Sequence, residues 1–383
     1  MSEAYIVDAI RTPGGRRGGG LSHLHPVDLG ARVLQGLVER AGIDPGTVDD
    51  VIFGCVAQVG SQAWNIARNA WLSAGYPEHV PGVTIDRQCG SSQQAVHFAA
   101  QGVQAGGYDL VVAGGVEVMS LVTLNSSGEV GPQLGFRYPF DGEGWHARFG
   151  DQEIHQFRGG ELIAQRWDIS RSDMEELALT SHQRAARAWD EGRFDTQILP
   201  VDGCTRDEGI RPDTTLEKMA TLPPLLGEGG RLTAALASQI ADGASALLIA
   251  SEEAVARYGL TPRARLPTMV VTGSDPVLIL TGPIPATAKA LEKAKLSVDD
   301  IDLFECNEAF ASVVLAWSRE TGVPLERTNV NGGAMALGHP LGASGAKLMT
   351  TLLCELERTG GRYGLQTMCE GGGLSNATIL ERV

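Results

Sequence analysis

The last third of the chain repeats the first third, and this internal repeat restricts the fold more than any other feature of the sequence. Residues 38–55 resemble residues 291–306, with Cys55 and Cys306 at corresponding positions 251 residues apart. A duplicated α/β unit places corresponding turns at the same edge of a sheet, related by a pseudo-two-fold axis. Residues far apart in the sequence then become neighbours at the junction of the two copies.

Apolar runs alternate with amphipathic segments in the first third of the chain. Strands are expected at residues 4–10, 50–55 and 108–115, and helices at residues 28–41 and 65–74. Strands that alternate with helices are typical of an α/β sheet with helices on both faces.

Residues 119–240 interrupt this alternation. Two helices are expected here, at residues 156–167 and 172–191, and the second opens with a capping-box pattern from Ser172 to Glu175. The block is therefore interpreted as an insertion that lies over a sheet.

The pattern of a buried strand returns at residues 241–251. We expect residues 1–118 together with 241–262 to form the N-terminal half of the core. Residues 119–240 would form an inserted loop domain, and residues 263–383 the C-terminal half.

Composition excludes several classes of protein. The content of hydrophobic residues (43%) and charged residues (20%) is that of a soluble globular protein, and the net charge of −15 disfavours nucleic acid or an anionic membrane as partner. The sequence has no apolar run of about 20 residues and no N-terminal signal pattern. The six cysteines lack the paired spacing of disulfides or zinc sites, so a cytoplasmic protein with free thiols is expected.

One of these cysteines stands in a turn between an expected strand and an expected helix. Residues 81–86 are interpreted as a buried strand, residues 93–101 as a helix, and Cys89 lies between them. The positive end of a helix dipole favours thiolate over thiol and directs backbone N–H groups outward, and both effects suit a nucleophile. For an isolated cysteine, the simpler interpretation is a small, buried, inert residue.

The repeat connects this turn to two others. The offset of the repeat carries Cys89 to the position beside His339, in a second strand-to-helix turn. It carries the glycine turn after Val112 roughly to residues 369–373. Cys89, His339 and Cys369 are therefore predicted to meet where the halves join.

Four motifs identify a family when they are taken together. They are Gln88–Ser91, Cys306–Phe310, Gly332–Gly345 and Cys369–Gly373. Each motif is weak alone, as a single glycine-rich fingerprint is. With all four in family order, the chain resembles the thiolase family, the acyl-CoA:acetyl-CoA C-acyltransferases, essentially from end to end.

The resemblance implies a fold and a reaction. The fold would be α/β, with duplicated βαβαβαββ halves that form a layered α-β-α-β-α core and an inserted loop domain. The reaction would be thiolytic cleavage of a 3-oxoacyl-CoA by coenzyme A, through a ping-pong acyl-cysteine mechanism that is reversible as a Claisen condensation. Coenzyme A would be a co-substrate, with no permanently bound cofactor and no metal.

The resemblance also assigns roles to residues. Cys89 would be the acylated nucleophile, and His339 would take its proton and later stabilise the thioester oxyanion. Asn307 would hold a water that completes this oxyanion hole, although a turn residue that bonds local backbone is the competing interpretation of Asn307. Cys369 would be the acid/base for acetyl-CoA and CoA, and the amides of Cys89 and Gly371 would form a second oxyanion hole.

The resemblance also implies that the inserted loop domain, residues 119–240, binds coenzyme A and makes oligomer contacts. Three further residues match positions that handle coenzyme A in the family. Ser238 matches a serine that bonds pantetheine, Arg211 matches an arginine that contacts phosphate, and His155 matches a histidine near the thioester. The alternatives are a serine without a ligand, a solvated arginine in an acidic loop, and an ordinary surface histidine.

The sequence departs from the family pattern at three places. Ser92 replaces a common glycine, Glu370 follows Cys369 where an apolar residue is usual, and residues 279–283 replace the segment that borders the acyl pocket. A carboxylate that pointed toward a catalytic thiol would raise the pKa of that thiol, so Glu370 is expected to point away.

The motifs look most like those of actinobacterial thiolases that degrade steroids, which implies lipid breakdown by β-oxidation and a branched or ring-derived acyl group. The aromatic-rich stretch 126–150 could line a bulky acyl pocket, or could be a structural or tetramer-forming loop. The alternatives in function are a biosynthetic thiolase that forms acetoacetyl-CoA, a ketoacyl-synthase-type condensing enzyme, and an inactive lipid-binding relative. Family members form homodimers or homotetramers.

Overall fold

The two copies of the repeat form the two ends of one mixed sheet. The structure, a computed structural model, describes residues 3–383, so the first two residues of the expected N-terminal half lie outside it. The order of strands is β4-β3-β5-β6-β1-β7-β10-β9-β8, and β2 pairs with β6. The strands are β1 (Ala4–Arg11), β2 (Gly15–Arg16), β3 (Asp50–Gly54), β4 (Gly82–Ile85), β5 (Leu110–Val118), β6 (Ala241–Ser251), β7 (Ala264–Gly273), β8 (Leu303–Cys306), β9 (Tyr363–Glu370) and β10 (Leu374–Arg382).

The pairing of the strands confirms the duplication. In the N-terminal copy, β3 runs parallel to β5, and β5, β6 and β1 follow as antiparallel neighbours. In the C-terminal copy, β8 runs parallel to β9, and β9, β10 and β7 follow in the same way. The copies join where β1 meets β7 at two residue pairs, Tyr5–Arg265 and Ile6–Ala264.

The helices described for residues 3–383 are not long and apolar enough to cross a membrane. They are α1 (Pro26–Ala41), α2 (Ile66–Ser73), α3 (Ser91–Gln104), α4 (Ser126–Gln133), α5 (Glu143–Phe149), α6 (Gln156–Arg166), α7 (Arg171–Asp190), α8 (Leu216–Ala220), α9 (Glu252–Tyr258), α10 (Pro283–Ala294), α11 (Ala311–Thr321), α12 (Ala334–Leu337) and α13 (Ser344–Thr359).

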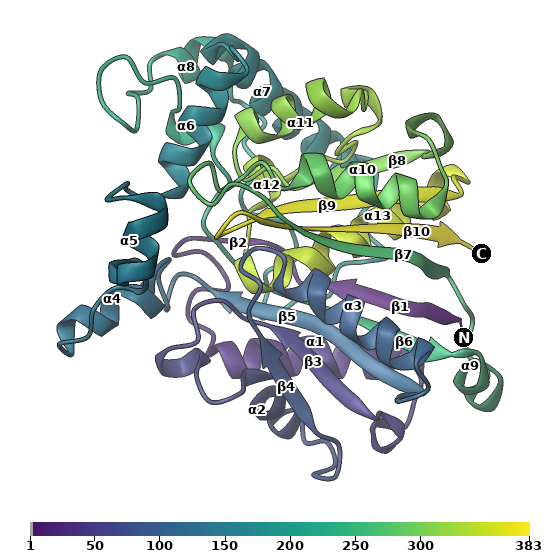
Figure 1. The fold of residues 1–383 in the computed structure, drawn as a ribbon. Helices are drawn as coiled ribbons and strands as arrows, with labels where there is room; N and C mark the ends of the chain where they lie inside the picture. Colours follow the sequence, from purple (N-terminus) through teal and green to yellow (C-terminus); the bar gives the residue numbers. More distant parts are fainter. Residues whose placement is uncertain (1–2) are drawn as a thin grey trace.

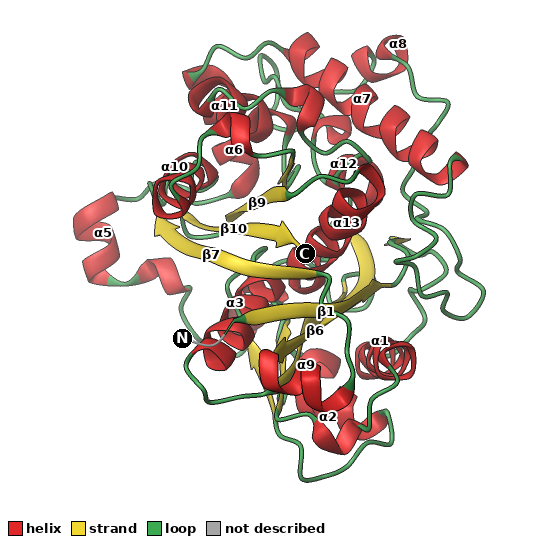
Figure 2. Cartoon of the chain, turned by 90° about the vertical axis from the view of Figure 1, so that its right-hand side faces the viewer, coloured by secondary structure: helices red, strands yellow, loops and turns green. Residues whose placement is uncertain are grey.

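Three apolar cores place these helices in layers. One core packs α1 and α2 on the outer face of the N-terminal strands, and another packs α10 and α11 on the outer face of the C-terminal strands. The third lies between the two copies and is built on α3 and α13 (Figure 1, Figure 2). This arrangement confirms the expected α-β-α-β-α layering.

Individual elements follow the sequence pattern closely, with one correction at the sheet edge. Gly42 ends α1 in the left-handed conformation, with φ 64°, and β6 has the predicted bounds. The strand before Cys89 was expected to be buried, but β4 is only half-buried, and Val83 is 41% exposed. The reason is its position, because β4 is the edge strand of the sheet.

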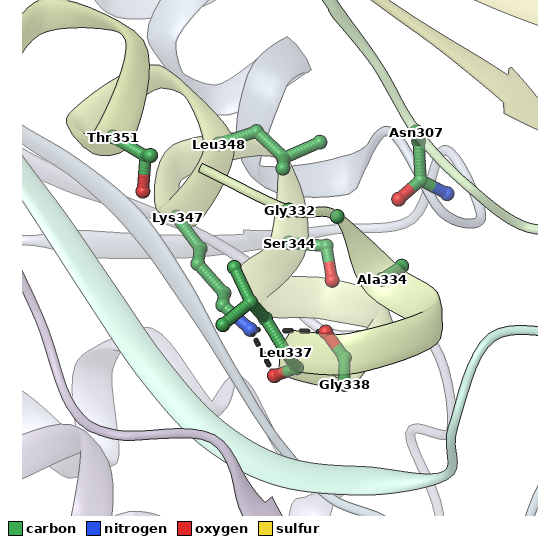
Figure 3. A pocket seen from close by; sticks show the side chains of 10 residues that line it. Asn307, Gly332, Ala334, Leu337, Gly338, Ser344, Lys347, Leu348 and Thr351 are labelled. Atoms are coloured by element: carbon green, nitrogen blue, oxygen red, sulfur yellow. Dashed lines mark hydrogen bonds between the residues drawn. The ribbon is translucent and has the colours of Figure 1, made fainter. Parts of the chain in front are cut away.

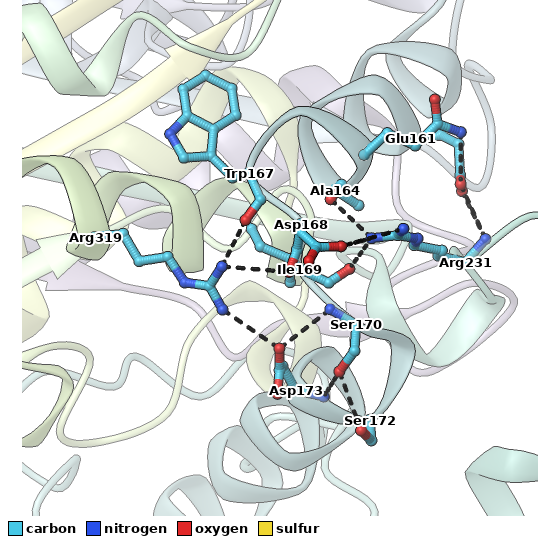
Figure 4. Close-up of polar contacts among 11 residues, drawn as sticks. Glu161, Ala164, Trp167, Asp168, Ile169, Ser170, Ser172, Asp173, Arg231 and Arg319 are labelled. Atoms are coloured by element: carbon cyan, nitrogen blue, oxygen red, sulfur yellow. Dashed lines mark hydrogen bonds and ion pairs between the residues drawn. The ribbon is translucent and has the colours of Figure 1, made fainter.

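The inserted block packs partly on the core and partly away from it. Helices α6 and α7 lie over the C-terminal copy, whereas α4 and α5 project from the body of the molecule (Figure 1). The turn between α6 and α7 is held by Arg231, which donates to the carbonyls of Ala164 and Ile169, and by Arg319, which donates to the carbonyl of Trp167 (Figure 4).

The capping box that opens α7 differs from the predicted one. Ser170 is the N-cap, with φ −74° and ψ 160°, and it exchanges hydrogen bonds with Asp173 (Figure 4). Ser172 already lies inside the first turn, so its pairing with Glu175 was wrong. Glu175 instead accepts a bond of 2.7 Å from Arg171, one turn earlier.

Candidate active site

Cys89 lies in a tight turn between β4 and α3. Gln88 has a positive φ of 50°, and its backbone N–H donates to the Asp86 carboxylate at 2.6 Å. The Ser91 hydroxyl donates to the Gln88 carbonyl at 2.6 Å and accepts from the Arg87 amide at 2.9 Å. These local bonds close the turn and hold Cys89 just before the first residue of α3.

A cavity of about 380 Å³ lies at this turn, and residues of both copies of the repeat line it. Cys89 comes from the N-terminal copy, whereas His339 and Gly371 come from the C-terminal copy, and all three line the cavity. The structure thus places three predicted site residues around one space that is large enough for a small-molecule ligand.

Two backbone amides oppose the rise in the pKa of the Cys89 thiol. Hydrogen bonds from the amides of Cys89 and Gly371 act to lower the pKa of the Cys89 thiol. These are the two donors that the sequence predicts for an oxyanion hole. A β-carbon at position 371 would lie 2.7 Å from the Gln88 side chain, so glycine suits this close approach.

A chain of hydrogen bonds fixes the tautomer of His339. The Ser344 hydroxyl donates to the Pro340 carbonyl at 2.8 Å, so it accepts from His339 Nδ1 at 2.6 Å. The Nε2 atom is therefore the unprotonated nitrogen, and it accepts from the Asn307 amide at 3.4 Å. Burial, with a smaller effect of Lys347, lowers the pKa of His339 to about 3. His339 is consequently a neutral base at physiological pH.

Cys369 lies on β9 and is completely buried. Burial raises the pKa of its thiol well above the ordinary value, and the negative charges of Cys89, Cys306 and Glu370 raise it further. Asn307 is also buried, and its side-chain amide lies 3.4 Å from His339 Nε2. Neither Cys369 nor Asn307 lines the cavity itself.

The helix dipole predicted a thiolate at Cys89, and this prediction is wrong for the free protein. Burial raises the pKa of Cys89 to about 12, and Glu370 contributes to the rise. The side chain packs in an apolar cluster with Met119, Leu341 and Met368. Loss of solvent around the sulfur outweighs the two amides that stabilise its charge, so Cys89 is a thiol in the free protein.

Glu370 leaves the face of Cys369, as expected, but its position against the turn of the other predicted catalytic thiol, Cys89, was not expected. Its side chain is fully buried against the turn of Cys89, where only the absence of a side chain at Gly90 leaves room for the carboxyl group. Neither carboxyl oxygen has a hydrogen-bond partner among the described residues. Burial raises the pKa of Glu370 to about 8, although Arg87 acts to lower it. Because side chains alternate along a strand, Glu370 leaves the face of Cys369 but meets the turn of the nucleophile.

These pKa shifts predict how alkylation of Cys89 depends on pH. With a thiol pKa of about 12, the rate should rise between pH 6 and 10 without a plateau, and ionisation of Glu370 above pH 8 should reduce its slope. The variant Glu370→Gln removes this charge, so its rate at pH 9.5 should exceed the wild-type rate by roughly threefold to tenfold. Iodoacetamide labelling, quantified on the peptide that contains Cys89, measures both effects.

The control is Glu305→Gln, which replaces another buried carboxyl group, one that is not among the groups that shift the pKa of Cys89. Its labelling curve should match that of the wild type. A wild-type plateau below pH 8, or identical curves for Glu370→Gln and the wild type, would contradict the electrostatic account of this turn.

The residues predicted to bind coenzyme A separate into two groups. Ser238 and His155 line the same cavity as Cys89. His155 caps α6, and its ring stacks on Phe157 with a distance of 5.1 Å between ring centroids. Arg211 is exposed and is not part of the cavity lining, and its backbone N–H donates to His182 at 3.2 Å.

The sequence did not predict two features of the site. One is a pair of aromatic rings in the cavity wall, and the other is Ser344, which bonds the ring of His339. Phe157 and Phe310 meet edge-on at 5.3 Å and both line the cavity. Phe310 and Ser344 belong to quoted motifs, but nothing in the spacing of those motifs assigns them a task. Ser344 could have been found as the first hydroxyl after His339 on the expected helix.

The aromatic-rich stretch 126–150 contributes to the cavity and also to the surface. Tyr138 and Phe140 line the cavity, and Phe140 packs on Trp145 at 4.8 Å. Leu134 and Phe136 are each 67% exposed. Of the two interpretations of this stretch, lining of the pocket therefore holds for part of it.

Comparison with known proteins agrees with this geometry. The family model described as "Thiolase, N-terminal domain" matches residues 4–253, and "Thiolase, C-terminal domain" matches residues 260–382. The chain is 59% identical to the steroid 3-ketoacyl-CoA thiolase FadA6 of Mycobacterium tuberculosis, with 100% of this chain and 95% of that protein covered. The chain therefore belongs to the thiolase family, whose members are acyltransferases of the acetyl-CoA C-acyltransferase type.

Solved structures of two other proteins share the fold. A human mitochondrial 3-ketoacyl-CoA thiolase in complex with CoA is 38% identical, with a TM-score of 0.90 and coverage of 100% of this chain and 98% of that chain. The acetyl-CoA acetyltransferase of Bacillus anthracis is also 38% identical, with a TM-score of 0.89 and coverage of 100% and 99%.

Proposed function

We propose that the protein is a 3-oxoacyl-CoA thiolase that cleaves a branched or ring-derived substrate in lipid or steroid breakdown. The observation that carries this proposal is that Cys89, His339 and Gly371, which come from different copies of the repeat, line one cavity. A thioester carbonyl placed there meets a nucleophile, a neutral base and oxyanion donors at once.

The first half-reaction forms an acyl-enzyme. His339 Nε2 takes the Cys89 proton as the sulfur attacks the 3-oxo carbon, which avoids a free thiolate in the buried site. The bond between Cα and Cβ then breaks, and its electron pair remains on the acetyl-CoA fragment as an enolate. His339 and a water on Asn307 stabilise the enolate oxygen, and Cys369 protonates the carbon. Acetyl-CoA leaves, or propionyl-CoA if the substrate carries an α-methyl group.

The second half-reaction returns the enzyme to its resting state. The Cys369 thiolate takes the proton of the CoA thiol, and the CoA sulfur attacks the acyl group on Cys89. The amides of Cys89 and Gly371 stabilise the tetrahedral oxyanion. Cys89 leaves as a thiolate and recovers its proton from His339, so atoms and charges balance over the cycle. Ser238 and His155 would contact the pantetheine arm and the thioester, and Arg211 a phosphate outside the cavity.

Two observations support a bulky acyl group. The cavity is bounded by side chains of the inserted stretch, including Tyr138 and Phe140, and by Ile279 and Leu280 in the segment that departs from the family pattern. The relative from Mycobacterium tuberculosis is named a steroid thiolase. Apolar and aromatic walls favour an acyl group with a large apolar surface.

A substrate panel tests the proposal. We expect kcat/KM for a ring-bearing or 2-methyl-branched 3-oxoacyl-CoA to exceed the value for acetoacetyl-CoA by about tenfold or more, because each additional buried methylene contributes about 0.8 kcal/mol. Release of acetyl-CoA or propionyl-CoA is the readout. Much faster turnover of acetoacetyl-CoA would instead favour a biosynthetic thiolase, an alternative supported by the likeness to an acetyl-CoA acetyltransferase.

We also propose that the protein is a cytoplasmic homodimer or homotetramer. The support is the edge strand β4, which has one unpaired side and directly precedes the turn of Cys89. An unpaired strand edge is a ready template for pairing with a second copy.

A further inference from the structure

Lys347 is a buried lysine that the proposed reaction does not use. It lies on α13, and its side chain is almost fully buried. Its Nζ atom donates to the carbonyl of Leu337 at 2.6 Å and to the carbonyl of Gly338 at 2.9 Å (Figure 3). Burial lowers the pKa of Lys347 to about 7, while Asp207 acts to raise it.

The two carbonyls are at the end of the short helix that leads directly into His339. Helix α12 has only four residues, and Gly338 leaves it with φ 77°. Carbonyls at a helix C-terminus lack intrahelical partners, and a cation placed there is favourable. Lys347 therefore supplies donors to two carbonyls of this turn, those of Leu337 and Gly338.

The same helix, α13, holds His339 from two sides. Ser344 binds the ring at Nδ1, and Lys347, three residues later, binds the backbone just before the histidine. The positive charge of Lys347 also acts to lower the pKa of His339, which favours the neutral base.

A cavity of about 10 Å³ lies between Lys347 and Asn307. Both residues line it, together with Ser344 and the backbone around Gly333. A single water needs about 10–15 Å³ and two to four polar partners. The Asn307 Oδ1 atom is buried and has no hydrogen-bond partner among the described residues, and an ammonium group has a third proton beyond the two that Lys347 gives to carbonyls.

We propose that Lys347 is a positioning residue for the catalytic pair: it holds the turn that carries His339 and, through one water in the small cavity, the amide of Asn307. This role rests on the proposed function, because it acts through the base and the oxyanion hole of the thiolase reaction. An amide anchored at Oδ1 keeps its Nδ2 directed at His339, which it contacts at 3.4 Å.

The test replaces Lys347 in the full-length protein by methionine, which keeps the length of the side chain but removes charge and donors. We expect kcat for thiolysis to fall roughly 100-fold, because misplacement of a catalytic group by 1 Å can cost that much, while KM for CoA changes less than about threefold. Alkylation of Cys89 should also slow, since its base is misplaced. Lys347→Arg, which keeps the charge and donors, should recover kcat to within about tenfold of the wild type.

The matched control is Lys289→Met. Lys289 also donates to a backbone carbonyl, that of Val271 at 3.0 Å, but it lies exposed on α10. Its kcat should equal that of the wild type. A folded Lys347→Met protein with wild-type kcat and wild-type labelling of Cys89 would overturn the proposal, because a purely structural lysine would change only the melting temperature.

A second measurement does not depend on whether the variant folds. A high-resolution crystal structure of the wild type should show one ordered water within hydrogen-bond distance of both Lys347 Nζ and Asn307 Oδ1, and its absence would refute the link. If no 3-oxoacyl-CoA is turned over by the wild type, the proposed function fails. The labelling of Cys89 and the position of the water still decide the role of Lys347 in that case.

Discussion

Replacement of Cys89 by alanine should abolish thiolysis. Cys89 lines the cavity together with His339, whose imidazole is neutral, and removal of a nucleophile from such a group costs on the order of a millionfold in kcat. Release of acetyl-CoA or propionyl-CoA from a 3-oxoacyl-CoA, followed over hours, measures the residual rate.

The control for this variant is Cys204→Ala, which removes a thiol in the inserted block that does not line the cavity. Its kcat should stay within about twofold of the wild type, since surface and peripheral substitutions have small effects. Turnover by Cys89→Ala above one-hundredth of the wild-type rate would show that another residue carries the acyl group.

Replacement of Cys369 by alanine should reduce thiolysis by roughly 1,000-fold to 10,000-fold, because a positioned acid/base contributes up to about that factor. The loss should be specific to proton transfer at carbon. Exchange of the methyl protons of acetyl-CoA with deuterated solvent, followed by NMR, should disappear, while transfer of an acyl group from acyl-CoA to Cys89 should still be detectable.

Cys306→Ala is the comparison for this second variant. Cys306 is equally buried and is electrostatically coupled to Cys369, but it is not assigned a role in proton transfer. Its exchange rate should remain within a few-fold of the wild type. Exchange that persists in Cys369→Ala at the wild-type rate would remove Cys369 from the mechanism.

The fold and the composition of the site could be predicted because both follow from the repeat. The offset between Cys55 and Cys306 places β3 and β8 in equivalent positions, and the strand pairing repeats accordingly. Once the two copies are superimposed in this way, Cys89 and His339 have to approach each other. The helices and strands follow from local apolar patterns and glycine stops, as at Gly42.

The electrostatics of the site could not be predicted from the sequence, because they depend on burial. The helix dipole pointed to a thiolate at Cys89, but the apolar packing around the sulfur and the buried carboxyl of Glu370 reverse the direction of the pKa shift. Strand alternation shows that Glu370 leaves the face of Cys369, but it does not show which group lies on the other side. The space beside Gly90 that the Glu370 carboxyl fills is created by tertiary packing and cannot be seen in the sequence.

The contacts that hold His339 in place could not be predicted either, because they too depend on the tertiary structure. Ser344 and Lys347 follow His339 closely in the sequence, but only the fold shows what they contact. Ser344 bonds the His339 ring, and Lys347 bonds the backbone carbonyl of Leu337. For Arg211 the sequence match suggested a role that the fold does not bring to the cavity. Arg211 is exposed and is not part of the cavity lining.

The most direct test of the account is the mass of the intact protein after a few seconds with a 3-oxoacyl-CoA in the absence of CoA. We predict an increase by the mass of the shortened acyl group, located on the peptide that contains Cys89 and lost when CoA is added. An unmodified protein that nevertheless releases acetyl-CoA or propionyl-CoA, or an acyl group on a different residue, would contradict it.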